Sequence, residues 1–152
     1  RMELWQTAGM MTKDFPLTGV GLRAFRMVLF YSYPVSLTQI GTDGTIHPHN
    51  LYLDIAATIG LPGMVAFCAL LGTWASMMLD VLKRSQGHKD EGYYKMIVIS
   101  LGSGMMAHLI FNLTDTISLG EKAGLVFWGV LGISGATWNL VRTELARDQI
   151  GT

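Results

Sequence analysis

The sequence has little charge for its length. Only 14% of its 152 residues are charged, whereas a soluble domain carries about a quarter. Half of the residues are hydrophobic and the mean hydropathy is +0.36. The formal net charge is zero, so the total charge gives no sign of a nucleic-acid partner. Together with long apolar runs, this composition indicates a lipid bilayer rather than a large water-soluble core.

Cysteine is almost absent. Because Cys68 is the single cysteine, an intramolecular disulfide is excluded. Its position inside an apolar run favours a packing role. A signal segment is also lacking, because no basic-then-apolar stretch precedes the first polar residues. Since the chain opens with Arg1 and a polar segment, we expect a fragment whose earlier membrane spans are missing.

Three apolar runs are long enough, or nearly so, to cross a hydrocarbon core of roughly 30 Å. They cover about 61–82, 96–117 and 123–141. Gly60 is expected to break the helix before the first run, and Pro62 suits the first turn of a new one. The sequence therefore predicts an all-α, polytopic integral membrane protein fragment, with three transmembrane helices preceded by an extracytoplasmic helical loop.

Basic residues set the expected orientation. They are concentrated in the joint 83–95 and in the tail 142–152. By the positive-inside tendency both segments are cytoplasmic. Residues 1–60 are then expected on the extracytoplasmic side, and residues 61–152 hold the three spans.

Within the loop, three short helices are predicted. Apolar residues at helical spacing indicate a helix over 2–13, with Leu4, Ala8 and Met11 on one side. A turn-rich connection over 14–21 leads to a second helix over 22–33, which Pro34 ends. Asn50 is suited to cap a third helix over 51–59.

The segment His47-Pro48-His49 is the strongest local signal for chemistry. His49 directly precedes the third helix, whose positive end favours a neutral imidazole that can accept a proton. The same helix end offers N–H groups to a phosphate. Two alternatives compete. A histidine before a helix is more often a capping or surface residue, and a His-X-His pair with Asp43 or Asp54 nearby is a weaker candidate for a metal site.

A polar stripe runs along the second predicted span. His108, Asn112 and Asp115 are spaced i, i+4 and i+7, which places them on one helix face. Such residues mark function or hydrogen bonds between helices. Helix–helix bonding is favoured for His108 and Asn112, whereas Asp115 is suited either to orient a catalytic group or to cap. A transporter or flippase lined by this stripe is the competing functional hypothesis.

The sequence resembles the O-antigen ligase and polymerase family. His49-Asn50, nine residues and then Gly60-Leu61-Pro62-Gly63 is similar to the family's His-Asn…Gly-X-X-Gly pattern. The flanking stretches also look like the family, in the same order. They are Arg1-Met2-Glu3-Leu4-Trp5, Asp14-Phe15-Pro16-Leu17-Thr18-Gly19-Val20-Gly21, Thr114-Asp115-Thr116 and Phe127-Trp128-Gly129.

The resemblance implies a glycosyltransferase of cell-surface polysaccharide assembly, at the outer face of the bacterial inner membrane. It implies transfer from an undecaprenyl-diphosphate glycan donor to a hydroxyl of a glycan or lipid A-core acceptor. Neither cofactor, metal nor nucleic acid is implied. The family's histidine corresponds to His49, as the base, and its loop arginine to Arg1, as a diphosphate ligand. A second family arginine lies upstream of this sequence.

Further residues are expected to support this site. Arg26, one helical turn after Arg23, is a candidate second ligand of the diphosphate, because a guanidinium binds phosphate in bidentate fashion. A snorkelling or solvated role is the alternative for both arginines. Four motif residues are expected to support the site, namely Asn50, Gly60, Gly63 and Asp115. The motifs do not separate ligases from polymerases or from protein-glycosylating relatives.

Overall fold

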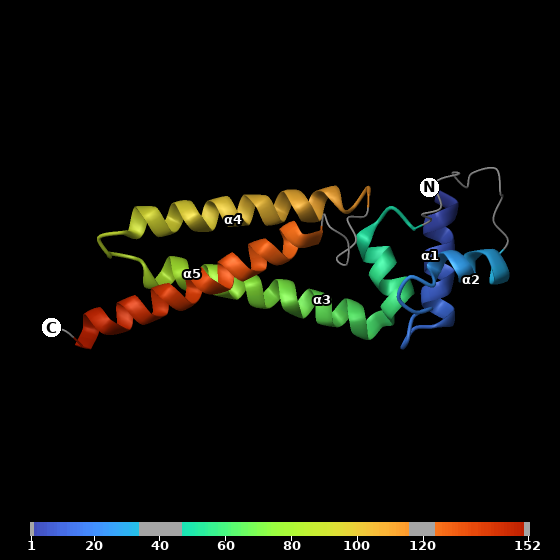
Figure 1. Ribbon diagram of the computed structural model, residues 1–152, viewed down its shortest axis with the longest axis horizontal. Coiled ribbons are helices and arrows are strands. Elements are labelled where there is room, and N and C mark those ends of the chain that lie inside the picture. Colours follow the sequence, from blue (N-terminus) through green and yellow to red (C-terminus); the bar gives the residue numbers. More distant parts are fainter. Residues whose placement is uncertain (1, 34–46, 116–123, 151–152) are drawn as a thin grey trace. The chain divides into compact units, whose positions relative to one another are not determined.

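The computed structural model describes residues 2–33, 47–115 and 124–150, with side chains up to residue 144. All regular structure in these ranges is α-helical, which confirms the predicted all-α class (Figure 1). The helices are α1 (Met2–Asp14), α2 (Phe25–Ser32), α3 (Leu51–Arg84), α4 (Glu91–Phe111) and α5 (Gly124–Ile150). Three of them, α3, α4 and the part Gly124–Glu144 of α5, are long and apolar enough to cross a membrane.

The chain forms two compact units. The first comprises residues 1–68 and 110–117, and the second comprises residues 69–109 and 118–152. Helices α3 and α4 each contribute to both. The predicted boundary after residue 60 falls inside α3, and the sides of the membrane on which the segments lie remain a prediction.

The first unit is organised around a small apolar core. Ala8 and Met11 of α1 pack with Phe25 and Leu29 of α2 and with Ala57 of α3, all almost fully buried. Burial of each of the larger side chains contributes about 1.5–3 kcal/mol. The predicted apolar side of the first helix is thus confirmed.

The second helix is shorter than its predicted range, 22–33, because Arg23 has a left-handed φ of 62° that a helix cannot include. At the other end of α2, the Tyr33 hydroxyl donates a hydrogen bond of 2.5 Å to the Asp14 carboxylate at the end of α1. Burial of the phenol, with this bond and the negative charge of Asp14, raises the pKa of Tyr33 to about 12. The contact ties the end of α1 to the end of α2.

A kink at Gly60 divides α3. The residue has φ 82° and ψ −176°, a conformation open essentially to glycine alone. The Leu61 N–H, freed by the kink, donates to the Pro16 carbonyl at 2.8 Å. A methyl group at position 60 would lie 2.8 Å from that carbonyl oxygen. The predicted break at Gly60 is confirmed, and Pro62 occupies the first turn after it.

The segment before α2 is hydrogen-bonded to the last turn of α3 before the kink. The Val20 N–H donates to the Ala57 carbonyl at 2.8 Å, and the Gly21 N–H donates to the Thr58 carbonyl at 3.0 Å. Both carbonyls belong to the last turn before the kink, where no helical partner is available. Gly19 allows this contact, because its added Cβ would lie 2.3 Å from the Thr58 carbonyl carbon.

The second unit is held together by polar contacts within a largely apolar set of helices. The Trp74 indole of α3 donates to the Ser134 hydroxyl of α5 at 2.9 Å, with both residues buried. Nearer the end of α3, Asp80 accepts bonds from the Trp138 indole at 2.8 Å and from Arg84 at 2.7 Å. Hydrogen bonds of this kind add specificity where apolar helices alone pack without direction.

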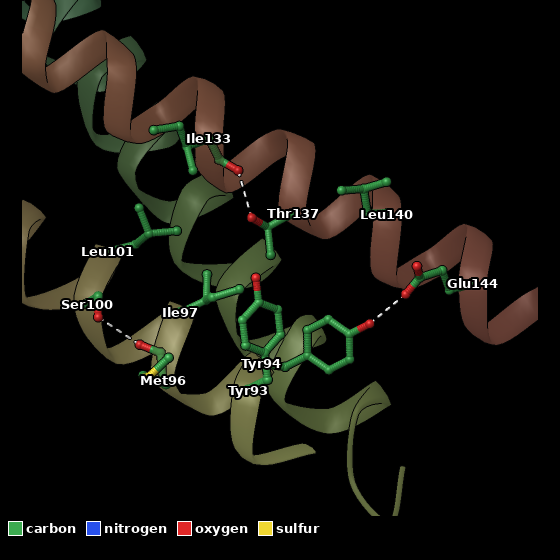
Figure 2. A pocket seen from close by; sticks show the side chains of 10 residues that line it. All are labelled: Tyr93, Tyr94, Met96, Ile97, Ser100, Leu101, Ile133, Thr137, Leu140 and Glu144. Atoms are coloured by element: carbon green, nitrogen blue, oxygen red, sulfur yellow. Dashed lines mark hydrogen bonds between the residues drawn. The ribbon is translucent and has the colours of Figure 1, made fainter. Parts of the chain in front are cut away.

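A shallow groove lies between α4 and α5 in the same unit (Figure 2). At one end the Tyr94 hydroxyl donates to the Glu144 carboxylate at 2.5 Å. The Ser100 and Thr137 hydroxyls in the groove bond carbonyls of their own helices. The rest of the lining is mainly apolar, so the groove lacks the convergent polar groups of a catalytic site.

The polar stripe predicted along 96–117 does not lie on one helix, because α4 ends before its last two members. The helix stops at Phe111, and Asn112 and Asp115 lie in the turns that follow. The backbone after Phe111 is instead hydrogen-bonded to the start of α3, where the Asn112 carbonyl accepts the Leu51 N–H at 3.0 Å. The prediction of one continuous helix face was therefore wrong for Asn112 and Asp115. His108 remains in α4, with its ring centroid 5.4 Å from that of Phe127.

Candidate active site

The candidate site is built on the turn His47–Asn50 that precedes α3. Pro48 at its centre is fully buried. Its carbonyl accepts a hydrogen bond of 2.8 Å from the indole N–H of Trp5 on α1. A buried carbonyl without a partner is costly, so this bond stabilises the turn in the position observed.

Asn50 joins the turn to two other parts of the first unit. Its side-chain oxygen accepts the Leu53 N–H at 3.0 Å, which confirms the predicted cap of the helix. Its side-chain amide donates to the Leu113 carbonyl at 2.9 Å. Because the residue is only 8% exposed, both bonds are shielded from water, and Asn50 fixes the segment after α4 against the start of α3.

The start of α3 is already occupied by protein groups. The Leu51 N–H is bonded to the Asn112 carbonyl and the Leu53 N–H to the Asn50 side chain. The predicted phosphate site on free N–H groups at this helix end is therefore not supported, because two of its donors are engaged by the protein itself.

His49 lies beside a carboxylate from a distant part of the sequence. Its Nδ1 is 2.9 Å from Oδ1 of Asp115. The two side chains are 33% and 42% exposed, so both partners are accessible from outside the protein. The backbone of His49 has φ 50°, a left-handed conformation that non-glycine residues seldom adopt and that clusters at functional sites.

The pairing fixes the roles of the ring nitrogens. An ionised carboxylate can only accept hydrogen bonds, so Nδ1 of His49 carries the proton that lies between the two groups. In the neutral ring the lone pair is then on Nε2, which can accept a proton. A carboxylate that orients a histidine in this way also stabilises the imidazolium formed after proton transfer. The arrangement is suited to general base chemistry.

His47 contacts His49 directly. The two ring centroids are 4.4 Å apart and the rings are inclined at 48°. His47 thus helps to hold the plane of the His49 ring. Because Nδ1 of His49 is engaged by Asp115, an ion in the metal alternative would have to bind Nε2 of His49. The described residues contain no group of three or more His, Cys, Asp or Glu side chains that could hold such an ion.

The described contacts bring together His49, Asn50 and Asp115. Arg26 is an exposed residue of α2, and its guanidinium carbon lies 5.8 Å from the Phe30 ring centroid. Arg1 lies outside the described residues. The roles of these five residues in the site remain predictions.

The motif glycines have backbone roles in the first unit. Gly60 forms the kink of α3, and Gly63 lies against Ile59 across it, with a distance of 2.5 Å from its added Cβ to the Ile59 side chain. Their spacing after His49 therefore reflects the length of helix between the turn and the kink. Supporting roles in catalysis remain predictions for both.

Trp5 is the residue that sequence reasoning missed. It stands in a stretch already singled out, but nothing in that stretch shows that its indole reaches a turn 43 residues away. A partly buried tryptophan does require an acceptor for its N–H. That requirement is the only signal that points to such a contact.

One family model matches the chain. Residues 1–68 match the family described as O-antigen ligase, the family to which the sequence motifs pointed. The match covers α1, α2, the His47–Asn50 turn and α3 as far as Cys68, beyond the kink, and it ends before Asp115. Among curated proteins no match was found.

Proposed function

We propose, from the O-antigen ligase segment formed by residues 1–68, that this chain is the catalytic end of a membrane glycosyltransferase. The family match supports a glycosyltransferase-type role in polysaccharide assembly, and the three apolar helices support a multi-pass membrane protein. The proposed donor is an undecaprenyl-diphosphate-linked glycan. The proposed acceptor is a hydroxyl of a glycan or of lipid A-core, on the extracytoplasmic side of the bacterial inner membrane.

The observation that carries this proposal is the pair His49–Asp115, with 2.9 Å between Nδ1 and Oδ1. In the proposed reaction, Nε2 of His49 removes the proton from the acceptor hydroxyl. The acceptor oxygen then forms a bond to the anomeric carbon of the donor sugar. The bond from that carbon to the diphosphate oxygen breaks, and its electron pair leaves with undecaprenyl diphosphate.

Asp115 has two roles in this scheme. It holds the proton on Nδ1, so that the lone pair of the ring is on Nε2. It also stabilises the imidazolium that forms when the acceptor proton arrives. Because Asp115 is proposed to act through the histidine, it is a positioning residue in this scheme.

The departing diphosphate gains negative charge, and a guanidinium is well suited to stabilise it. Arg1 and Arg26 are proposed as its ligands. A bidentate arginine offers a planar fork that a lysine lacks. Metal independence is part of the same proposal, since the arginines would supply the positive charge that a divalent ion supplies in other phosphate chemistry.

The transporter alternative has lost the observation that favoured it. Its argument required His108, Asn112 and Asp115 on one helix face, whereas α4 ends at Phe111. Asp115 instead contacts His49 in the first unit. We therefore develop only the transferase.

The function is tested with the full-length protein in lipid nanodiscs. The protein is given an undecaprenyl-diphosphate-linked glycan and, in parallel, lipid A-core, free glycan and peptide acceptors. We expect one acceptor to become glycosylated, with an equal amount of undecaprenyl diphosphate released. Failure with all three acceptors, together with movement of the intact donor across vesicle membranes, would contradict the proposal.

A further inference from the structure

The first unit has a second set of large apolar side chains that the core does not use. They lie along residues 15–31 and are exposed by 43–86%. Its members are Phe15, Leu17, Leu22, Met27, Phe30 and Tyr31. We call this set the outer apolar surface. Helix α2 is therefore apolar on two sides, one in the core and one outside it.

Such exposure is unusual for a protein that faces water. Leu17 and Leu22 are 73% and 76% exposed, while Phe25 and Leu29 in the same region are 3% and 0% exposed. Exposed apolar side chains are common singly, but a set of six within a short segment marks an interaction surface. The question is which partner covers it.

The backbone contacts place this surface next to the start of a membrane span. The Leu61 N–H donates to the Pro16 carbonyl at 2.8 Å, and Leu61 begins the apolar part of α3 that follows the kink. Leu17 is the neighbour of that carbonyl. A residue adjacent to the start of a span lies at the depth of the lipid headgroups, where half-buried apolar side chains are stabilised.

The charges nearby fit the same partner. Lys13 and Arg23 are exposed at either end of the loop that carries Leu17 and Leu22. The one carboxylate among them, Asp14, is already bonded to Tyr33. An apolar surface flanked by cations is the combination that binds a bilayer containing anionic phospholipids.

We propose that the outer apolar surface docks onto the lipid bilayer, with its apolar side chains at the level of the acyl chains nearest the headgroups and with Lys13 and Arg23 at lipid phosphates. Docking fixes the depth of the candidate active site. The same loop holds the end of the first part of α3 through Val20 and Gly21. The first part of α3, from Leu51 to the kink at Gly60, spans roughly 13 Å, and the turn with His49 lies directly before it.

The test uses nitroxide labels in the full-length protein, reconstituted into vesicles of phosphatidylethanolamine and phosphatidylglycerol. In a Cys68→Ser background, single cysteines replace Leu17, Leu22 or Glu3. Glu3 is an exposed polar residue of α1 and is the matched control. Power saturation compares collisions with oxygen, which enters the bilayer, and with a water-soluble nickel chelate.

We expect the labels at positions 17 and 22 to be relaxed by oxygen more than by the nickel chelate, with the opposite order at position 3. Equal access to the nickel chelate at all three positions would overturn the proposal, because the surface would then face water. Protection of positions 17 and 22 from both reagents would also overturn it, because another protein segment would then cover the surface. The measurement does not depend on transfer activity, so it leaves the proposed reaction untouched.

Discussion

The indole N–H of Trp5 donates to the carbonyl oxygen of Pro48 at 2.8 Å. The two residues belong to different parts of the matched segment, one in α1 and one in the turn before α3. Pro48 is fully buried, so water cannot replace this donor. The conformation of the turn that presents His49 therefore depends on a helix that lies 43 residues earlier in the sequence.

Trp5→Phe tests that dependence. The variant keeps the ring packing but leaves the buried carbonyl of Pro48 without its donor, a loss of about 1–3 kcal/mol. We expect a lower turnover number with little change in KM, because the base is displaced while the substrates still bind. Trp74→Phe is the control, since it removes the bond to Ser134 in the second unit and should lower thermal stability while transfer is retained. Equal transfer in the Trp5 variant and the wild type would exclude a positioning role.

Asp115→Asn tests the charge beside the base. The amide can still approach Nδ1 of His49, but it cannot stabilise an imidazolium. We expect the turnover number to fall by roughly 10²-fold or more, with partial recovery in Asp115→Glu. The matched control is Asp90→Asn, which alters another histidine–carboxylate pair, His88–Asp90 at 3.7 Å, and should leave transfer unchanged. Similar small effects of the two asparagine variants would show that Asp115 does not act through His49.

Gly60→Ala tests the kink. The new methyl group would lie within 3 Å of Pro16 and Gly19 backbone atoms, and the positive φ would add strain. We expect a substantial loss of thermal stability and of membrane abundance. Gly72→Ala is the control, because nothing lies within 4 Å of its added Cβ and alanine is preferred to glycine by about 1 kcal/mol in a helix. A Gly60 variant as stable as the Gly72 variant would contradict the described kink.

Tyr33 provides a test at alkaline pH. Its pKa is raised from 10.0 to about 12, so folding favours the protonated phenol. The stabilisation is complete below pH 10 and is lost as the pH rises through about 12. The free energy of unfolding of the wild type should therefore approach that of Tyr33→Phe over this interval. A constant difference between them across the interval would mean that the Tyr33–Asp14 bond does not contribute.

The local features of the fold could be predicted from the sequence. Apolar spacing predicted the buried side of α1, and the pair Gly60 and Pro62 predicted the break in α3, because both depend on the residue and its immediate neighbours. The residue at which α4 ends could not be predicted from the sequence, because the apolar residues Leu113 and Ile117 continue the pattern of a membrane span. The two residues after the helix, Asn112 and Leu113, use their carbonyls to accept hydrogen bonds from the Leu51 N–H and the Asn50 side chain at the start of α3.

The candidate site could be predicted from the sequence only in part. The short pattern around His49 and Asn50 indicated a base and a helix cap, and the cap is confirmed. The pairing of His49 with Asp115 joins positions 66 residues apart, and it requires the turn after α4 to pack against the turn before α3. The periodicity of apolar residues does not predict a contact between two such distant turns. The same holds for Trp5 and Pro48.

The most direct measurement of the central claim compares His49→Ala with His47→Ala in the full-length protein. The assay follows glycan transfer from a purified undecaprenyl-diphosphate donor, with and without a chelator, at equal amounts of inserted protein. We predict a loss of about 10²–10⁴-fold for His49→Ala, a much smaller loss for His47→Ala, and no effect of the chelator. Equal losses in the two variants, or loss on chelation, would contradict a metal-free base at His49 and would favour a His-X-His metal site.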